Sequence, residues 1–289
     1  MTHQFRWLAA MLISVLWSTL AFGLEADDED KKSSEDAEEE KTIAELIDGD
    51  TEVAGLFTFY RDSDTGKTTL LLKKNQLQKE YIYFVHVANG VVDAGSFRGA
   101  YGPRFVFTIE RRFDKVAIVR ENTAFYFDPE NAISRASEAN ITRAVLAVQP
   151  ILAEDEQTGE LLVDTDSLFL SEAFTRLAPT PDPDADPKVG FKVGELNAEK
   201  SQILALRSYP LNTDIEVEYV FYNPQPLVGG SDAVTDPRNI SIRALHSLIE
   251  MPDNDYLPRR ADPRLGSFNQ QITALTSNEA APYRDVINR

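Results

Sequence analysis

Four consecutive segments rich in β-branched and aromatic residues constrain the fold most strongly. They are YIYFVHV (81–87), RFVFTIE (104–110), KVAIVRE (115–121) and AFYFD (124–128). Such side chains fit the pleated, half-buried surface of a sheet. Phe113-Asp114 and Asn122-Thr123 join the last three segments, and connections this short link antiparallel neighbours. The pattern predicts an antiparallel β-meander.

Further segments extend the predicted sheet on both sides. GLFTFYRD and KTTLLLKK flank the turn sequence SDTG near the start, which favours a β-hairpin. In the last third, ILALRSYP (203–210), DIEVEYVFY (214–222) and NISIRALHSLI (239–249) return to strand character. Apolar and more polar residues alternate in the latter two, as in strands with one buried face.

The spacing of apolar residues along the sequence changes between these two sets of predicted strands. Apolar residues recur at i, i+4, i+7 and i+11 in the segment around residues 139–155, which is one face of a helix. These residues are Ile141, Val145, Val148 and Leu152. Pro150 should kink or end this helix. A second helix is predicted over about residues 167–177 with Asp166 as its N-cap. The predicted fold class is therefore α+β, antiparallel β-meander sheets with a two-helix insertion.

A proline-rich segment, APTPDPDADPKVG (178–190), interrupts the predicted folded region. Its composition is typical of an extended loop or an internal joint. Residues 42–289 are expected to form one α+β domain. Two lobes, 42–178 and 190–289, are the alternative organisation.

The first 23 residues have the composition of a secretory signal peptide. MTHQFRW carries one Arg and no acid, LAAMLISVLWSTLAF is apolar, and small residues precede an expected cleavage near Gly23. An uncleaved membrane anchor is the alternative. We expect an exported protein, periplasmic or extracellular, with no stable membrane insertion after cleavage.

An acidic tract follows the predicted signal peptide. Residues 24–41 hold ten acids against three lysines and almost no apolar side chains, which predicts a disordered spacer. The whole chain has a formal net charge of −18. Nucleic acid is disfavoured as a partner because its phosphates would meet like charge. The chain contains no cysteine, which excludes thiol catalysis and thiolate metal sites.

The histidines do not form a recognisable zinc motif. Outside the signal peptide there are only His86 and His246, both in strand-like segments, and neither is followed by Glu. A His-Glu-x-x-His zinc helix is therefore absent from the sequence. A single strand histidine is typically a hydrogen-bonded core residue. We predict no catalytic residue, no metal ligand and no cofactor for this chain.

The segment DYLPRRADPRLGSFNQQ (255–271), hereafter the Pro-Arg segment, carries the most specific resemblance. Its prolines exclude a helix or a central strand. With the preceding residues it resembles the region before the catalytic domain in bacterial secreted zinc-dependent metalloproteases whose zinc site is similar to that of metzincins. The matching residues are Arg207, Ser208, Pro210, Asn212, Asp236, Arg238, His246, Ser247, Leu248, Pro252, Tyr256, Pro258, Arg259, Asp262, Pro263, Arg264, Gly266 and Phe268.

This resemblance implies a non-catalytic N-terminal region of a zinc metallopeptidase, a hydrolase. It implies that a peptidase domain with a His-Glu-x-x-His-x-x-Gly-x-x-His helix is truncated or split from this chain, and that zinc belongs to that domain. The Pro-Arg segment would be an interdomain strap in which Arg259 and Arg264 pair with acids. Asp236, Arg238 and His246 would have structural roles.

Two other interpretations remain open at this point. The first is a free-standing exported β-rich module that binds peptides or glycans through aromatic residues such as Tyr101, Phe125 and Tyr222. Alternatively, the chain is a degenerate product without activity of its own.

Overall fold

A computed structural model describes residues 41–178, 184, 191–253, 264, 269–276 and 283–287. The predicted signal peptide, nearly all of the acidic spacer, most of the 178–190 segment and most of the Pro-Arg segment lie outside these residues. The described residues belong to one compact unit, Glu40–Arg289.

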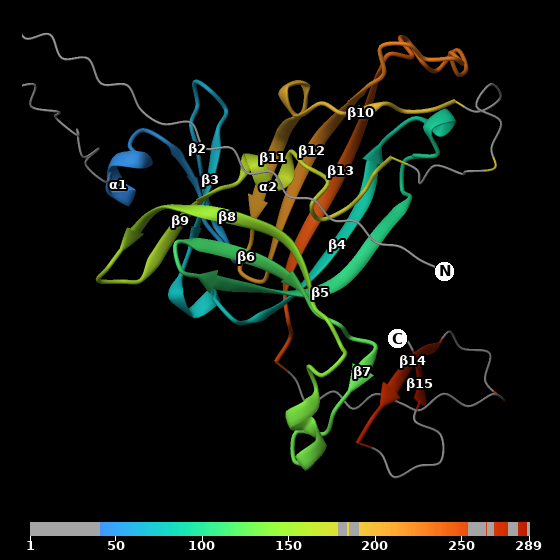
Figure 1. The fold of residues 1–289 in the computed structure, drawn as a ribbon. Coiled ribbons are helices and arrows are strands. Elements are labelled where there is room, and N and C mark those ends of the chain that lie inside the picture. Colours follow the sequence, from blue (N-terminus) through green and yellow to red (C-terminus); the bar gives the residue numbers. More distant parts are fainter. Residues whose placement is uncertain are drawn as a thin grey trace, which may run out of the picture. The chain divides into compact units, whose positions relative to one another are not determined.

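Twelve strands form one large, mostly antiparallel sheet (Figure 1). They are β1 (Thr51–Val53), β2 (Thr58–Arg61), β3 (Thr68–Leu72), β4 (Glu80–Asn89), β5 (Tyr101–Arg112), β6 (Lys115–Arg120), β8 (Ala144–Asp155), β9 (Glu160–Asp164), β10 (Glu195–Leu196), β11 (Gln202–Ser208), β12 (Asn212–Tyr222) and β13 (Asn239–Glu250). Their order is β1-β2-β3-β9-β8-β6-β5-β4-β13-β12-β10, and β11 also pairs with β12.

Short helices and a second, three-stranded sheet complete the described structure. The helices are α1 (Ile43–Leu46), α2 (Asp166–Phe169) and the 3₁₀ turns Lys74–Gln76, Val92–Ala94, Ala132–Ala136 and Ala198–Lys200. The small sheet has the order β15-β14-β7, with β7 at Phe125–Tyr126, β14 at Asn269–Ala274 and β15 at Tyr283–Ile287. No helix in the described residues is long and apolar enough to cross a membrane.

The predicted antiparallel meander is confirmed for β4, β5 and β6, which are sequential neighbours in the large sheet. The fourth predicted strand, around Phe125, leaves this sheet and becomes β7 of the small one. β8 takes the place beside β6 instead, with Arg120 paired to Ala144. Residues 122–143 therefore form an excursion between β6 and β8.

The large sheet nearly closes on itself because its first strands reach β11. Leu56 N donates to Tyr209 O (2.6 Å), Ser208 Oγ donates to Phe57 O (2.7 Å), and Arg61 Nη2 donates to Ile203 O (2.9 Å). The backbones approach so closely here that a Cβ on Gly55 would lie 2.6 Å from Tyr209 N. Glycine is the residue that permits this contact.

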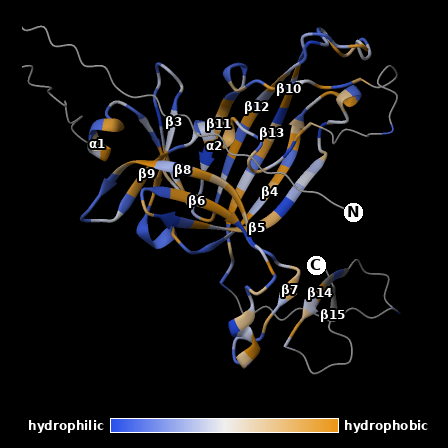
Figure 2. Ribbon diagram, in the orientation of Figure 1, coloured by the Kyte–Doolittle hydropathy of each residue, from blue (hydrophilic) through white to orange (hydrophobic). Residues whose placement is uncertain are grey.

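The core fills the interior of this nearly closed sheet. Alternate residues of β4, β12 and β13 are buried, as one inward face requires. Figure 2 shows hydrophobic residues recurring along these strands. The segment that begins at α2 adds Phe169 and Phe174, whose rings stack with centroids 5.1 Å apart. Both rings are almost completely buried.

The helix predicted around residues 139–155 is wrong, because this segment forms strand β8. Two bulges, at Leu146 opposite β6 and at Leu152 opposite β9, interrupt its alternation. They leave Val145, Val148 and Leu152 exposed at spacings of three and four residues. Pro150 is tolerated because pairing with β9 starts only at the next residue.

The second predicted helix exists as a single turn, α2. Its N-cap is Thr165, and Asp166 is already helical. The Asp166 carboxylate instead accepts hydrogen bonds from the Thr68 hydroxyl and backbone N–H. Beyond Phe169 the chain is irregular, yet Leu170 and Leu177 still pack against the core. The apolar pattern therefore located buried residues although the helix stops early.

Strands from both sides of the 178–190 segment contribute to the large sheet. β4 pairs with β13 over eight residue pairs, from Arg243–Asn89 to Glu250–Tyr81. The two lobes considered from the sequence therefore share one sheet.

Candidate functional site

His246 occupies the centre of a buried hydrogen-bonded chain. Its Nδ1 lies 2.8 Å from the Tyr83 hydroxyl, and its Nε2 lies 2.8 Å from the Tyr219 hydroxyl. The Tyr219 hydroxyl also donates to Phe169 O at 2.8 Å. β4, β12 and β13 position the three rings, and the last contact connects the end of α2 to the sheet.

The number of available donors and acceptors determines the direction of each hydrogen bond in this series. Tyr219 uses its only proton on Phe169 O, so its oxygen must accept a hydrogen bond from His246 Nε2–H. A neutral imidazole then has an acceptor at Nδ1, which receives the hydroxyl proton of Tyr83. Every polar atom of the imidazole is thereby paired in its neutral form.

Burial favours the neutral state of these three groups. It lowers the pKa of His246 to about 3 and raises the pKa values of Tyr83 and Tyr219 far above their ordinary value. His246 is only 1% exposed, so no substrate reaches it in this conformation. The arrangement is that of a structural histidine and not of an acid–base catalyst.

The side chains of Asp236 and Arg238 form an ion pair in the loop before β13. Arg238 Nη2 donates to Asp236 Oδ2 at 2.8 Å, and Arg238 Nε donates to Asp236 Oδ1 at 3.0 Å. The arginine holds the pKa of the Asp236 carboxyl well below its usual range. Both side chains remain solvent-accessible, so this pair shapes the loop and places no charge in a cavity.

The structure places His86 away from His246, on the outer face of β4. Its ring lies 6.0 Å from that of Phe84, which in turn lies 5.7 Å from Tyr101. His86 is half-buried. No group of three or more metal-ligating side chains occurs within the described residues.

The three aromatics considered as a binding platform lie on separate parts of the described structure. Tyr101 pairs with His86, which pairs with Leu245 on β13. Tyr222 pairs with Asn239, six positions away along β13, and its ring carries the Lys200 ammonium at 4.3 Å. Phe125 belongs to the small sheet. The strand register thus gives these three rings no common surface.

Most of the predicted interdomain strap lies outside the described residues. This applies to Tyr256, Pro258, Arg259, Asp262, Pro263, Gly266 and Phe268. Arg264 is described, and it is exposed. Strand β14 begins in the last three residues of the Pro-Arg segment and runs parallel to β7, and Thr273 N donates to Ala124 O at 2.9 Å.

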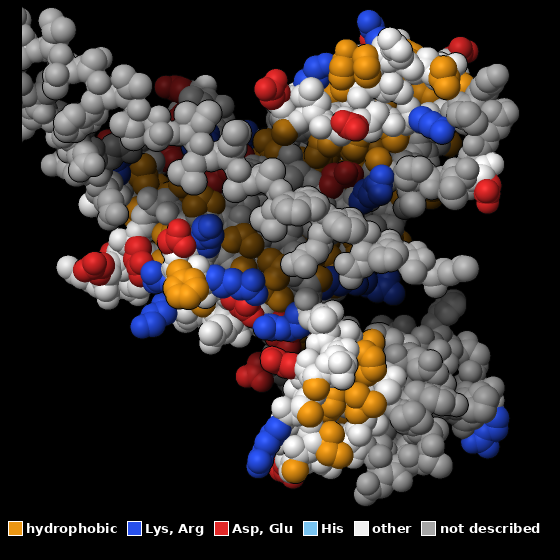
Figure 3. Space-filling model, viewed as in Figure 1, with side chains coloured by type: hydrophobic (Ala, Val, Ile, Leu, Met, Phe, Trp, Pro, Cys, Tyr) orange, Lys and Arg blue, Asp and Glu red, His pale blue; other side chains and the backbone are white. Residues whose placement is uncertain are grey.

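The excursion, residues 122–143, contains no buried side chain, although it forms β7 and a 3₁₀ turn. Phe125, Tyr126 and Ile133 are 37%, 49% and 53% exposed, and Leu275 beside Tyr126 is 41% exposed. Figure 3 shows apolar side chains gathered over the part of the surface formed by β7 and the 3₁₀ turn. We call these four residues the apolar patch.

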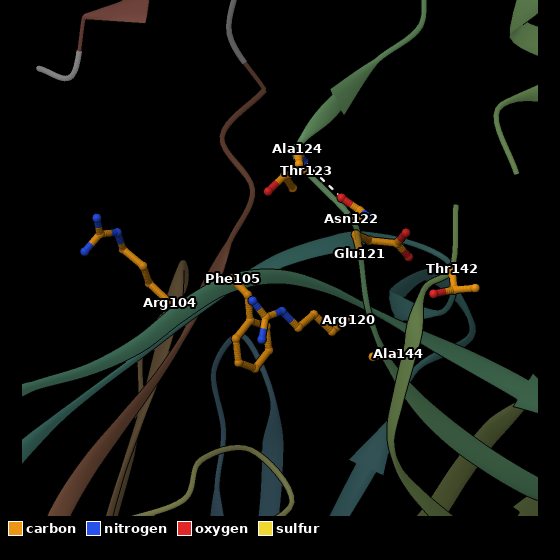
Figure 4. A pocket seen from close by; sticks show the side chains of 9 residues that line it. All are labelled: Arg104, Phe105, Arg120, Glu121, Asn122, Thr123, Ala124, Thr142 and Ala144. Carbon is orange, nitrogen blue, oxygen red and sulfur yellow. Dashed lines mark hydrogen bonds between the residues drawn. The ribbon is translucent and has the colours of Figure 1, made fainter. Parts of the chain in front are cut away.

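A pocket with a volume of about 330 Å³ lies where the excursion leaves β6. It is lined by Arg104, Phe105, Arg120, Glu121, Asn122, Thr123, Ala124, Thr142 and Ala144 (Figure 4). The Arg120 guanidinium stacks on Phe105, with Cζ 4.9 Å from the ring centroid. Sequence reasoning missed this site because its residues come from β5, β6, β8 and the excursion.

The geometry defines an antiparallel β-rich domain with a filled interior, an exposed excursion and a polar pocket. Residues 99–289 match a family described as a domain of unknown function, DUF5117. This match covers more than half of the chain, so the protein belongs to that family. No curated protein and no solved structure matches the chain significantly.

Proposed function

We propose that this chain is the non-catalytic N-terminal region of an exported zinc-dependent metallopeptidase. Its role would be to pack on the peptidase domain and support it. The resemblance of residues 207–268 to metallopeptidase sequences identifies the proposed partner. The exposed excursion is the observation on which the supporting role depends.

The described residues of the resembling motifs favour a scaffold. Ser208 hydrogen-bonds to Phe57 O and Thr213 where the large sheet closes. Ser247 donates to Asp214 across the β12–β13 pair at 2.7 Å. His246 is paired within the core. These side chains make their hydrogen bonds within the domain, as we expect for a region that supports a partner and has no catalytic residues of its own.

The excursion provides the surface for such a partner. A segment of 22 residues with no buried side chain contributes nothing to the core, yet its backbone is organised by pairing with β14. Aromatic residues such as Phe125 and Tyr126 are typical centres of protein interfaces. We infer that the peptidase domain covers the apolar patch.

Association with the peptidase domain tests this proposal. The partner in this test is a peptidase domain of the resembling metalloproteases that carries the His-Glu-x-x-His-x-x-Gly-x-x-His helix, expressed separately and mixed with this chain. Calorimetry and light scattering should show a complex. Tyr126→Ser should weaken it about tenfold or more, because buried interface aromatics contribute most of the binding energy.

Phe113→Ser is the matched control. Phe113 is 94% exposed at the tip of the β5–β6 hairpin and lies outside the apolar patch. This variant should bind as the parent does. Stoichiometric zinc together with casein hydrolysis by the 289-residue chain alone would refute the non-catalytic role. Failure of the two proteins to associate would refute the supporting role.

A further inference from the structure

We propose that the pocket at the β6–excursion junction binds a carboxylate group. The group is carried by a free small carboxylic acid or by an acidic side chain of a polypeptide. This inference rests on the pocket alone and does not depend on the peptidase proposal.

The lining of the pocket has a charge of the opposite sign to that of the whole protein. The chain has a formal net charge of −18, whereas the charged residues of the lining are two arginines, Arg104 and Arg120, and one acid, Glu121. Arg104 and Arg120 both line the pocket and are exposed. Within the described residues, neither guanidinium has a carboxylate oxygen within 4 Å.

The one carboxylate that lines the pocket is already partnered. Glu121 Oε1 accepts hydrogen bonds from the Thr108 hydroxyl (2.8 Å) and from Arg143 Nη1 (3.3 Å). Figure 4 shows the Glu121 carboxylate pointing away from the Arg120 guanidinium. The Arg120 guanidinium therefore faces the pocket without an internal counter-ion from this residue, whereas the Arg104 side chain points away from Arg120 in Figure 4.

Neutral donors supplement the arginines. In the described part of the chain, the hydroxyl groups of Thr123 and Thr142 make no hydrogen bond. Asn122 accepts the N–H of Ala124 through Oδ1 at 3.1 Å, which leaves its NH₂ group as a donor. Guanidinium forks match carboxylates in bidentate geometry, and stacking on Phe105 restrains Arg120.

The lining also selects among anions. Phe105, Ala124 and Ala144 give the pocket apolar walls beside its cations, which suits a carboxylate on a short hydrocarbon chain. The fixed negative charge of Glu121 opposes a phosphate dianion more than a monovalent carboxylate. A volume of about 330 Å³ accommodates one small acid or one side chain.

Titration calorimetry on the full chain tests the inference at about 20 mM salt, where screening is weak. The probes are butyrate, an acetyl-Ala-Glu-Ala-amide peptide and inorganic phosphate. We expect saturable binding of at least one carboxylate probe below about 10 mM, tighter than that of phosphate. Butyrate binding assigns a free acid as the source, and binding of the peptide alone assigns a polypeptide.

Variants separate this pocket from general charge attraction. Arg120→Gln should weaken binding about tenfold or more, because hydrogen bonds to a charged group are lost. Arg120→Lys should weaken it less, since the charge remains but the fork is lost. Lys115→Gln removes the same charge from the other end of β6 and should change binding less than about twofold.

Three results would overturn the inference. They are no saturation by either carboxylate probe, phosphate binding as tight as that of the carboxylates, and equal losses for Lys115→Gln and Arg120→Gln. Because Arg120 is exposed, its variants should unfold as the parent does, which circular dichroism checks. The peptidase association test involves Tyr126 and not these arginines, so the two proposals fail separately.

Discussion

The interior of the large sheet and the excursion use aromatic residues in opposite ways. In the interior, Tyr83, Tyr219 and Phe169 surround His246, and the imidazole and both phenols are hydrogen-bonded. In the excursion, Phe125 and Tyr126 also lie on a paired strand but remain exposed.

This difference separates residues that stabilise the fold from residues that are available to a ligand or partner. Burial of apolar surface is the dominant favourable contribution to folding, so the interior aromatics determine stability. Exposed aromatics contribute little to folding. The comparison predicts large effects on unfolding in the interior and small effects in the excursion.

The largest effect should come from Phe169→Ala. Phe169 is 1% exposed, stacks on Phe174 and meets His246 edge-on with ring centroids 5.6 Å apart. Removal of such a ring costs about 3–5 kcal/mol of unfolding free energy. Urea denaturation followed by circular dichroism measures it. Phe113→Ala, at a 94% exposed position, should change stability by less than about 0.5 kcal/mol, and equal losses would contradict the comparison.

Acidification should destabilise the fold through His246. Its pKa is about 3 when folded and near 6.5 when unfolded, so the unfolded chain binds more protons below pH 6.5. The free energy of unfolding should therefore fall as the pH falls from 6.5 toward 3, by up to about 1.4 kcal/mol per pH unit. Between about pH 6.5 and 5 ordinary carboxylates stay ionised, which isolates the histidine.

His246→Leu provides the control for this pH dependence. The variant loses stability at neutral pH because Tyr83 is left without an acceptor. Its unfolding free energy should nevertheless vary much less over the same pH interval. If parent and variant show the same slope, the neutral buried imidazole is not the source of the acid sensitivity.

Gly55→Ala should have an intermediate effect at the closure of the sheet. The added Cβ would meet Ser208 Oγ and the backbone of Ser208 and Tyr209, and backbone cannot move aside cheaply. Overpacking of this kind costs about 1–3 kcal/mol. Gly229→Ala is the matched control because nothing lies within 4 Å of its Cβ position. Thermal unfolding of both variants distinguishes a tight closure from a loose one.

The sequence predicted the meander because two-residue connections and β-branched runs determine local pairing. It mispredicted β8 because bulges at Leu146 and Leu152 produce the three- and four-residue spacing of a helix. It also placed β7 beside β6, since nothing local shows that the chain leaves the sheet after Arg120. Pro150, in the middle of the predicted helix, was the one residue that argued against a helix there.

The sites depend on pairings far apart in sequence. His246 was recognisable as a strand histidine, but its partners Tyr83 and Tyr219 are 163 and 27 residues away. They meet only because β13 lies between β4 and β12. The pocket likewise combines Arg104 and Arg120 from neighbouring strands with the start of the excursion. No short motif encodes either arrangement.

The smallest effect on unfolding should come from the excursion, and a pair of tyrosine variants tests it most directly. Tyr126→Ser removes a whole ring, but that ring is 49% exposed, so stability should change by no more than about 0.5 kcal/mol. Tyr83→Phe removes a single oxygen, yet it leaves His246 Nδ1 buried without a donor and should cost about 1–3 kcal/mol.

Urea titrations of both tyrosine variants under one set of conditions measure the two effects. The smaller chemical change should have the larger consequence because only Tyr83 belongs to the buried network. If Tyr126→Ser destabilises as much as Tyr83→Phe, the excursion is part of the folding unit. The apolar patch would then have a structural role, which removes the main reason to assign it to a partner.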